Sequence, residues 1–359
     1  MTEQGATRLL TARPLSGRVL ILEPPDSGAI AQLRAAAPAE AELSAWTFDV
    51  RHAPFATLFE NSALSATLDA RFDVALVYLP KGKARQRLVL DLAARALLPG
   101  GELRVVGGKR EGIRSIRGAV AERFEQTLEI TSGAHAQCVV ARAPVLRSVG
   151  NPLSMEAYAS EASLPVPGEP LTCVWFPGVY GADKLDEGSA LLLATLAPEL
   201  ERGLWDGARR VLDVGCGSGV LGAFLARALR SRPLATEEVS VDLVDVDALA
   251  VCAARATLDR NGLTGSGVSV WGSDVYSAVR ERYDAIVSNP PFHDGVGTSY
   301  DAAQRLIREA PTHLRPMGRL VLVANAFLPY RDALDAAFGA HRVLAETPRF
   351  RVYEGVRRS

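Results

Sequence analysis

Short apolar runs alternate with amphipathic segments along the second half of the chain. The apolar runs cover residues 210–214, 239–245, 268–271, 283–289 and 319–325. Between them, apolar residues recur at spacings of three and four from near Val220, Ala248, Ser299 and Tyr330, which predicts helices. Strands that alternate with helices form a doubly wound, mainly parallel sheet with helices on both faces. The stretch 341–356 has two strand-like runs about a Thr-Pro turn and predicts a closing antiparallel hairpin.

The first half repeats this pattern in a weaker form. The segment "RFDVALVYLPKGK" aligns with "RYDAIVSNPPFHD" at a constant offset of 211. Likewise, "GRVLILEPPDSGAIAQL" stands in the place of "ARRVLDVGCGSGVLGAFL", and "LLPGGELRVVGG" in the place of "LRPMGRLVLVAN". Three matching segments in the same order predict a duplicated fold. The polar motifs differ between the copies, since Tyr78 stands opposite Asn289, so we expect a degenerate first copy and a catalytic second copy.

A proline-rich stretch separates the two copies. Between Ala143 and Pro177 the prolines are frequent and the apolar periodicity fades, which is typical of a linker. We therefore predict a first domain over 1–143, a linker over 144–177 and a second domain over 178–359. A chain of 359 residues is long enough for two domains of ordinary size.

The composition excludes several classes of protein. With 48% hydrophobic and 23% charged residues, the chain is neither fibrous nor disordered. No segment approaches the roughly 18 uncharged apolar residues of a membrane span, and the start of the chain lacks an apolar signal core, so we expect a cytoplasmic protein. The four cysteines form no Cys-x-x-Cys pair and the five histidines show no ligand spacing. We expect buried thiols and no metal site.

Basic residues are concentrated in one part of the first half. The whole chain has a formal net charge of -1, which argues against a uniformly basic surface for nucleic acid. From Lys81 to Arg123, however, there are 11 basic and 4 acidic residues. Such a cluster can bind phosphate, or it can be an ordinary solvated helix face. The phosphate-binding interpretation assigns contacts to Lys81, Lys83, Arg85, Arg87, Lys109 and Arg110.

A glycine-rich turn follows the first strand of the second half. In "VLDVGCGSGVLG", Gly215, Gly217 and Gly219 permit a sharp bend around Cys216 and let a ligand approach the backbone. The helix that follows begins with free N–H groups. Read from Gly217, the stretch also fits the G-x-G-x-x-G fingerprint of dinucleotide-binding folds, so a nicotinamide-dependent dehydrogenase remains an alternative at this point.

Three aspartates favour a different ligand. Asp213 lies inside the strand before the turn, where a carboxylate suits a cationic ligand better than a pyrophosphate. Asp245 ends the next strand, where a ribose diol can bind both carboxylate oxygens, but it follows Gly217 by 28 residues rather than the roughly 20 of dinucleotide folds. Asp274 follows the third strand and is placed to accept a hydrogen bond from an adenine amino group. The combination indicates S-adenosylmethionine, an adenosine with a sulfonium cation and no phosphates.

The motif "SNPPF" ends the fourth strand. An exocyclic amino nitrogen must become tetrahedral to accept a methyl group, because its lone pair is delocalised into the ring. The side-chain oxygen of Asn289 and the carbonyl of Pro290 can accept its two hydrogens. Pro291 restricts the loop, and Phe292 can stack on the base. An ordinary Asn-Pro turn is the alternative. We predict methylation of a planar amino or amide nitrogen.

Three stretches carry a family resemblance. The segments "DVGCGSGVLG", "SNPPFHDGVGTSYDAAQ" and "VANAFLPYRDALDAAFG" resemble the bacterial ribosomal RNA small subunit methyltransferase C family, which methylates the N2 amino group of a guanine in 16S ribosomal RNA. The resemblance implies an α/β protein with two tandem Rossmann-like class I methyltransferase folds. Each would have a seven-stranded, mainly parallel sheet with an antiparallel closing hairpin, and the degenerate first fold would assist RNA binding.

The same resemblance assigns the site residues and partners. It implies that Gly215, Gly217, Asp245 and Asp274 bind S-adenosylmethionine and that Asn289, Pro290 and Phe292 bind the target guanine. The segment "GVYGADKLDEGSALLLATL" resembles the family's segment that covers the cofactor, and it matches at Asp186 and Gly188. The implied partner is 16S ribosomal RNA or the small ribosomal subunit, and we expect a monomer.

Four other functions remain open from the sequence. A guanine-N2 methyltransferase of large-subunit RNA shares the motif, although "VANAFLPY" favours the small subunit. Adenine-N6 and protein glutamine-amide methyltransferases also use Asn-Pro-Pro-aromatic loops. A nonenzymatic RNA chaperone is possible for the first copy, whereas the intact glycine turn argues against it for the second.

Overall fold

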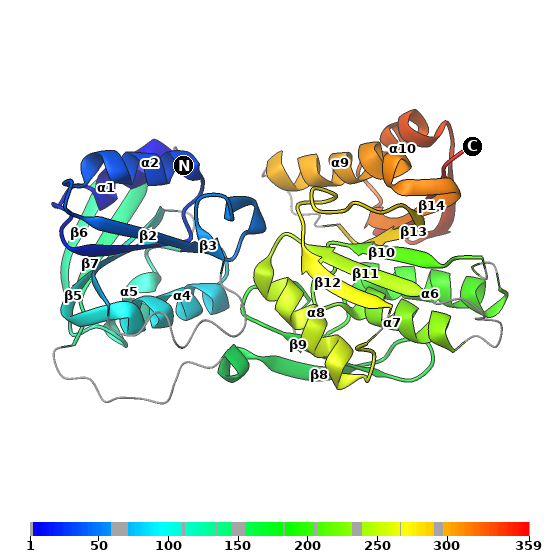
Figure 1. The fold of residues 1–359 in the computed structure, drawn as a ribbon, viewed down its shortest axis with the longest axis horizontal. Helices are drawn as coiled ribbons and strands as arrows, with labels where there is room; N and C mark the ends of the chain where they lie inside the picture. Colours follow the sequence, from blue (N-terminus) through cyan, green and yellow to red (C-terminus); the bar gives the residue numbers. More distant parts are fainter. Residues whose placement is uncertain are drawn as a thin grey trace. The chain divides into compact units, whose positions relative to one another are not determined.

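The chain divides into two compact units, 1–159 and 160–359, in a computed structural model (Figure 1). Each unit is an α/β structure with its own sheet and is described by itself. The structure describes residues 3–58, 71–109, 112–133, 135–144, 155–181, 184–203, 205, 207–231, 239–265, 267–290 and 297–358.

The second unit contains a seven-stranded sheet with the order β12-β11-β10-β13-β14-β16-β15. Only the pairs of β16 with β14 and β15 are antiparallel. Its elements are β8 (Ser160–Leu164), β9 (Leu171–Trp175), α6 (Glu187–Glu201), β10 (Arg210–Val214), α7 (Val220–Arg230), β11 (Ser240–Asp245), α8 (Ala248–Arg260), β12 (Val268–Gly272), β13 (Tyr283–Ser288), α9 (Gly297–His313), β14 (Leu314–Asn325), α10 (Tyr330–Phe338), β15 (His341–Glu346) and β16 (Phe350–Val356).

The first unit has the same strand order, β3-β2-β1-β4-β5-β7-β6. Its elements are α1 (Glu3–Leu10), β1 (Arg18–Leu22), α2 (Ser27–Ala36), β2 (Glu42–Thr47), η1 (Val50–His52), β3 (Thr57–Leu58), β4 (Phe72–Tyr78), α4 (Lys83–Ala96), β5 (Leu97–Gly108), α5 (Ile116–Ala121), β6 (Gln126–Gly133), β7 (Ala136–Arg142) and η2 (Met155–Tyr158). The predicted tandem α/β folds with closing hairpins are confirmed.

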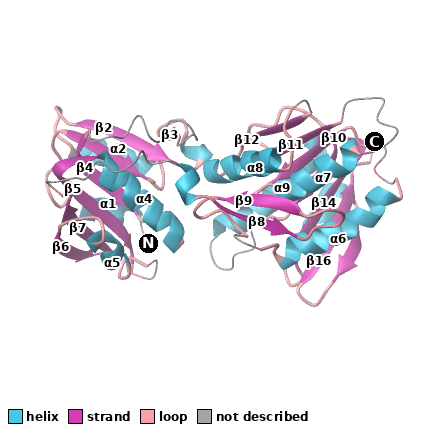
Figure 2. Cartoon of the chain, turned by 90° about the horizontal axis from the view of Figure 1, so that it is seen from below, coloured by secondary structure: helices cyan, strands magenta, loops and turns pink. Residues whose placement is uncertain are grey.

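Both faces of the second sheet are covered by helices (Figure 2). The side chains of Leu212, Ile286 and Leu322 pack with α9 and α10 in one core cluster. On the other face, α7 lies so close that a Cβ at Gly222 would meet Leu243 at 2.3 Å. Strands buried on both faces read as continuous apolar runs in the sequence, which is why periodicity located them.

The predicted linker over 144–177 is wrong for the part that the structure describes. Residues 155–158 form η2 in the first unit, and β8 and β9 form an antiparallel hairpin in the second. The hairpin is fixed to α8 by side-chain hydrogen bonds, since Asn261 Nδ2 donates to Thr172 O at 2.7 Å and Val174 N donates to Thr257 Oγ1 at 2.9 Å. Prolines at the ends of these strands made the segment resemble a linker.

Matching local contacts support duplication beyond the strand order. Asp73 Oδ2 accepts the N–H of Arg18 at 2.8 Å, and Asp284 Oδ2 accepts the N–H of Arg210 at the same distance. The register of β4 with β5 shifts after Phe72, and that of β13 with β14 shifts at the equivalent place, after Tyr283. These details repeat although most side chains have changed.

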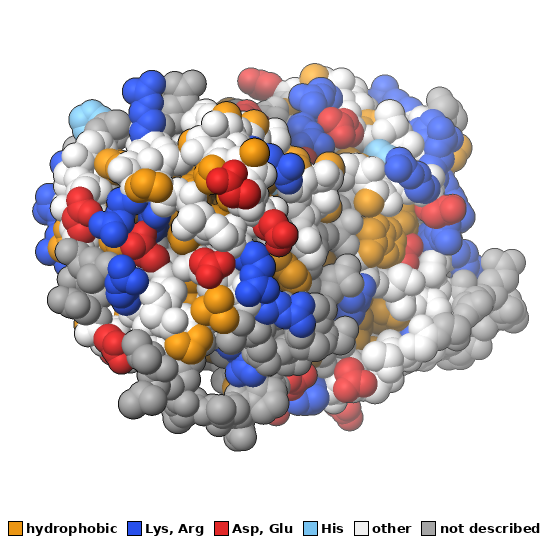
Figure 3. Space-filling model, turned by 60° about the vertical axis from the view of Figure 1, so that its left-hand side comes forward, with side chains coloured by type: hydrophobic (Ala, Val, Ile, Leu, Met, Phe, Trp, Pro, Cys, Tyr) orange, Lys and Arg blue, Asp and Glu red, His pale blue; other side chains and the backbone are white. Residues whose placement is uncertain are grey.

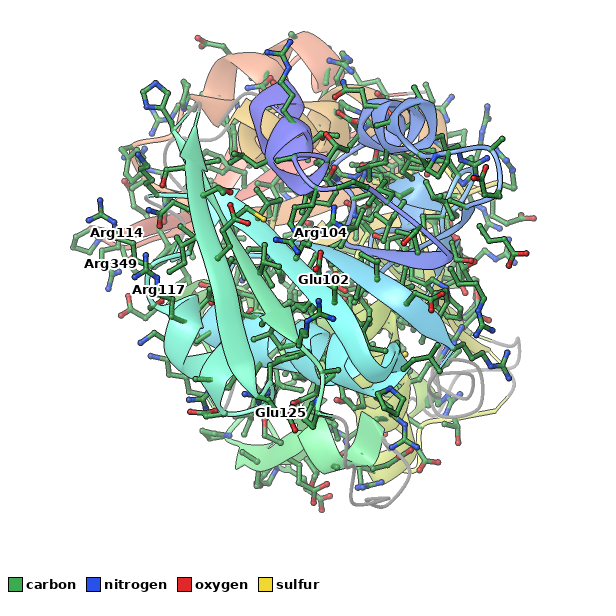
Figure 4. The ribbon with its side chains drawn as sticks, turned by 90° about the vertical axis from the view of Figure 1, so that its left-hand side faces the viewer. Glu102, Arg104, Arg114, Arg117, Glu125 and Arg349 are labelled. Carbon is green, nitrogen blue, oxygen red and sulfur yellow. The ribbon has the colours of Figure 1, made fainter. Side chains whose placement is uncertain are left out.

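Arg104 fixes the start of the first unit to its sheet. The residue lies on β5 beside Glu102 (Figure 4), and its side chain is only 3% exposed. Its Nε donates to Glu102 Oε1 at 2.8 Å. Its terminal nitrogens donate, each at 2.7 Å, to the carbonyls of Leu10, Arg13 and Pro14. A buried guanidinium thus satisfies carbonyl groups at the end of α1.

We predict that Arg104→Ala lowers the free energy of unfolding of the first unit by roughly 3–5 kcal/mol, because Glu102 and three carbonyls would lose their buried partner. Chemical denaturation of the whole chain measures this. Arg114, which is exposed at the outer edge of the same unit (Figure 4), is the control, and its alanine variant should change stability by less than about 0.5 kcal/mol. Equal effects of the two substitutions would contradict the assignment.

Candidate functional site

A cavity of about 530 Å³ lies at the carboxyl edge of the sheet in the second unit. This volume is within the usual range for small-molecule sites. Eight of the residues predicted from the sequence line it: Asp186, Gly215, Cys216, Gly217, Asp245, Asp274, Asn289 and Pro290. Parallel strands bring their carboxyl ends to one edge, which is why the residues at the ends of β10, β11, β12 and β13 meet here, and Asp186 joins them from the start of α6.

The three glycines of the turn, Gly215, Gly217 and Gly219, have two different structural roles. Gly215 and Gly217 have φ values of 72° and 55°, and a Cβ at either position would meet nothing within 4 Å. They therefore leave room at the cavity. Gly219, with φ 80°, begins α7, and a Cβ there would lie 2.9 Å from Ala254 Cα. Gly219 was predicted to contact a cofactor, but it does not line the cavity. Its role is to let the turn pack closely on α8.

Asp213 lies beneath the turn and does not line the cavity. Its side chain is fully buried, and Oδ2 accepts the N–H of Gly222 at 2.9 Å. Its other oxygen has no hydrogen-bond partner among the described residues. Burial raises the pKa of Asp213 to about 7. The predicted direct role beside a cationic ligand needs correction, because the carboxylate anchors the first turn of α7 instead.

Asp245 reaches the cavity and is held in place by the backbone. Oδ2 accepts the N–H of Gly217 and Oδ1 that of Asp247, both at 2.9 Å. Burial raises the pKa of Asp245 to about 6, and the two N–H groups oppose that shift. Each carboxylate oxygen keeps a second lone pair, so the group can still accept hydrogen bonds from a ligand.

Asp274 forms an ion pair that the sequence did not reveal. Arg305 Nη1, from α9, donates to Asp274 Oδ2 at 2.7 Å. The backbone N–H of Asp274 donates to Ser277 Oγ at 3.0 Å. The ion pair fixes the carboxyl group of Asp274, and the second hydrogen bond fixes its backbone where the residue lines the cavity.

Asn289 is oriented by two acceptors at the start of α6. Its Nδ2 donates to Asp186 Oδ1 at 3.1 Å and to Ser189 Oγ at 2.9 Å. Both hydrogens of the amide are thereby used, and no donor among the described residues reaches Oδ1. The amide oxygen is the atom left for a ligand.

Asp186 and Gly188 support this arrangement. Asp186 Oδ1 also caps α6 by accepting the N–H groups of Gly188 at 3.0 Å and Ser189 at 3.1 Å. A Cβ at Gly188 would lie 3.3 Å from Asn289 Oδ1, so glycine gives the amide its space. The two residues were predicted to cover a cofactor, and the structure places them against Asn289. Ser189 was missed, because only the tertiary contact with β13 distinguishes it from other serines.

Three predicted residues, Arg110, Pro291 and Phe292, lie outside the described residues. The carbonyl group of Pro290 is therefore the last described part of the loop after β13. Within the part of the chain that the structure describes, no group of three or more His, Cys, Asp or Glu side chains could hold a metal ion. All four cysteines are buried thiols, as predicted. No helix among the described residues is long and apolar enough to cross a membrane.

At the corresponding edge of the first unit, side chains with partners of their own replace residues of the glycine turn and the Asn-Pro-Pro motif. Glu23 occupies the place of Gly215, with φ 55°, and accepts the N–H of Phe48 at 2.9 Å. Arg85 is only 7% exposed, and its guanidinium lies 4.8 Å from the centre of the Phe48 ring. In the place of Asn289 stands Tyr78, whose hydroxyl lies 2.9 Å from Thr7 Oγ1. The prediction of a degenerate first copy fits these replacements.

The predicted basic cluster is only partly on the surface. Arg85 is buried, so its assignment as a phosphate contact is wrong. Lys81, Lys83, Arg87 and Lys109 are exposed. On the face shown in Figure 3, basic side chains are interspersed with acidic ones. A phosphate-binding role of the four exposed residues stays a prediction.

The fold and the site together define a class I methyltransferase. A family model described as the methyltransferase small domain matches residues 170–354, and one described as its N-terminal domain matches residues 11–147. The ribosomal RNA small subunit methyltransferase C of Escherichia coli (strain K12) is 41% identical over 299 residues, which are 82% of this chain and 79% of that protein.

Two further comparisons agree. The protein of the same name from Salmonella paratyphi B is 42% identical over 285 residues, 79% of this chain and 75% of its own length. The solved structure of the T. thermophilus 16S rRNA N2 G1207 methyltransferase, in complex with AdoMet and guanosine, has a TM-score of 0.81 at 27% identity and covers 98% of this chain and 92% of that one. The chain belongs to the ribosomal RNA small subunit methyltransferase C family.

The buried carboxyl group of Asp213 predicts a pH dependence of stability. Its folded pKa of about 7 lies above the unfolded value of about 3.9, so the folded state holds an extra proton between these values. The stability from this group is complete below about pH 4 and is lost as the pH rises through 7. We expect Asp213→Asn to remove about 2–3 kcal/mol of the stability difference between pH 5 and pH 8, because about two pH units of that interval lie below the folded pKa.

Urea denaturation of both proteins at the two pH values measures this difference. Asp245→Asn is the comparison, because the pKa of Asp245 is raised less, to about 6. An unchanged pH profile for Asp213→Asn would mean that the carboxyl group is not buried as described.

Proposed function

We propose that this protein transfers the methyl group of S-adenosylmethionine to the N2 amino group of a guanine in 16S ribosomal RNA. The oriented amide of Asn289 carries this proposal. With both its hydrogens bound to Asp186 and Ser189, its oxygen can accept one hydrogen of an amino group, and the carbonyl of Pro290 can accept the other. These acceptors favour a tetrahedral nitrogen whose lone pair is available for reaction.

The cavity fits the methyl donor. Gly215 and Gly217 leave open space where side chains would otherwise stand, and Asp245 presents a carboxylate for a ribose diol. Asp274 also lines the cavity, and we assign to its carboxylate a hydrogen bond from the adenine amino group. When bound, S-adenosylmethionine supplies an electrophilic methyl group on a sulfonium. The chain needs no strong base, because the amino group becomes acidic as it gains the methyl group.

The names of the relatives support the choice of base and RNA. The proteins from E. coli and Salmonella are named small subunit methyltransferases, and the T. thermophilus structure is titled as a guanine-N2 enzyme of 16S rRNA. These names favour the small subunit over large-subunit RNA, and guanine over adenine or a glutamine amide. We keep the expectation of a monomer as part of the proposal.

Supplying S-adenosylmethionine with a tritiated methyl group to separated ribosomal subunits, free RNAs and a DNA control tests the reaction. We expect label only in 16S RNA, recovered as N2-methylguanosine after digestion to nucleosides. Asn289→Ala should reduce transfer by about 10²–10³-fold, the usual cost of one catalytic hydrogen bond, while calorimetry shows unchanged donor binding.

Ser189→Ala supplies an internal comparison, since it keeps Asn289 but removes one of its two acceptors. Its transfer rate should fall between those of wild type and Asn289→Ala. Label in another base or in protein would refute the substrate assignment. Loss of donor binding by a folded Asn289→Ala variant would refute the role of the amide.

The exposed basic residues of the first unit are proposed to bind RNA phosphates. We expect the combined replacement of Lys81, Lys83 and Arg87 by Gln to weaken binding of 16S RNA and to reduce the slope of log affinity against log salt by about 2, or about 0.7 for each single-strand contact. Arg85→Met is the matched control. It should lower stability without changing the salt slope, because Arg85 is buried. An unchanged slope in the triple variant would make these residues an ordinary solvated surface.

A further inference from the structure

One exposed aromatic side chain lines the cavity, and another lies two residues beyond a residue that lines it. Among the described residues, the exposed large apolar side chains are those of Ile130, Tyr180, Met317, Phe327 and Val343. Tyr180, 60% exposed, lines the cavity directly. Phe327, 68% exposed, follows two residues after Asn325, which also lines it. Exposed aromatic rings beside a binding cavity indicate an interaction surface.

A cation lies beside the same cavity. Arg349 lines the cavity, and its Nη1 lies 2.7 Å from both carboxylate oxygens of Glu187. The two side chains are 70% and 64% exposed. An ion pair this exposed contributes only about 0–1 kcal/mol, so another anion can replace Glu187 at little cost. A guanidinium is well suited to phosphate, which it can bind through two parallel hydrogen bonds.

Two hydrogen bonds connect the segments of chain that carry Phe327 and Arg349. Ala326 N donates to Arg349 O at 2.8 Å, and Arg351 Nη1 donates to Ala326 O at 2.6 Å. The loop after β14, which carries Phe327, is therefore tied to the turn between β15 and β16, which carries Arg349. The two backbone segments that carry Phe327 and Arg349 are thus held next to each other.

We infer that Tyr180, Phe327 and Arg349 form a subsite, here called the rim, for the nucleotides that flank the target guanine in single-stranded RNA. This inference rests on the proposed function, because a strand whose base enters the cavity must leave across its mouth. Aromatic rings stack on any base, and a neighbouring cation binds the backbone, which is how single strands are held without sequence preference. Glu187 keeps Arg349 in place until a phosphate replaces it.

The ion pair between Arg349 and Glu187 provides a test, because substitutions of its two partners should change RNA binding in opposite directions. Binding of a short fluorescent single-stranded RNA with one central guanine is measured by anisotropy on the full chain at several salt concentrations. Arg349→Ala should weaken binding about three- to tenfold and reduce the salt slope by about 0.7. Glu187→Gln should tighten binding, because it removes a charge that repels phosphate. A purely structural ion pair would make both variants change binding in the same direction, and that result would overturn the inference.

Stacking is tested separately. Phe327→Ala should weaken binding about fivefold or more and leave the salt slope unchanged. Met317→Ala is the control, since Met317 is equally exposed, at 68%, near the other end of β14. Arg260→Ala and Glu161→Gln are controls for the ion pair, because these partners lie 2.9 Å apart, are each 51% exposed and do not line the cavity.

The outcomes separate the rim from the proposed reaction. Binding needs no catalysis, so the predicted shifts in a protein that transfers no methyl group would support the rim and refute the proposed function. Normal methyl transfer, with RNA binding unchanged in Arg349→Ala and Phe327→Ala, would refute the rim alone. Concentration-dependent self-association that Phe327→Ala abolishes would assign the surface to a second copy of the chain and also overturn the inference.

Discussion

The site depends on one hydrogen-bonded amide. The two ends of the Asn289 side chain have nearly the same shape, but only the oxygen can accept a hydrogen bond from an amino group. Strand β13 sets the position of the residue, and Asp186 and Ser189, 103 and 100 residues earlier in the chain, set its orientation. Asp186 caps α6 with the same oxygen, so the start of that helix and the direction of the amide are coupled. Position and orientation thus come from separate parts of the fold.

The two units show that the backbone fold alone does not determine whether a unit has a functional site. Their sheets have the same strand order, and Tyr78 stands in the place of Asn289. Tyr78 contacts Thr7 on α1, whereas Asn289 contacts Ser189 on α6, and a phenol in place of the amide presents no carbonyl oxygen. The same architecture therefore carries different side chains at the corresponding edge of each unit, and function follows from those side chains.

The sequence predicted the features that depend on local pattern. The central strands were recognisable because both of their faces are buried, and the turn because its three glycines have positive φ angles, which glycine adopts most readily. Features set by tertiary packing were missed. Leu212 and Val214 on β10 face the core under α9 and α10. Because successive side chains of a strand point to opposite faces, Asp213 between them faces α7 and does not reach the cavity. Arg85 belongs to a basic run, yet its place on α4 turns it inward onto Phe48.

The first unit also explains why glycine stands at 215. Glu23 holds the equivalent backbone position with φ 55°, and its N–H bonds to Trp46 O as that of Gly215 bonds to Val244 O. The turn can therefore form with a side chain present, and conformational freedom alone does not account for the glycine. At Gly215 the direction of a Cβ is open. The requirement at this position is space for a ligand, and the degenerate copy has lost that requirement while keeping the bend.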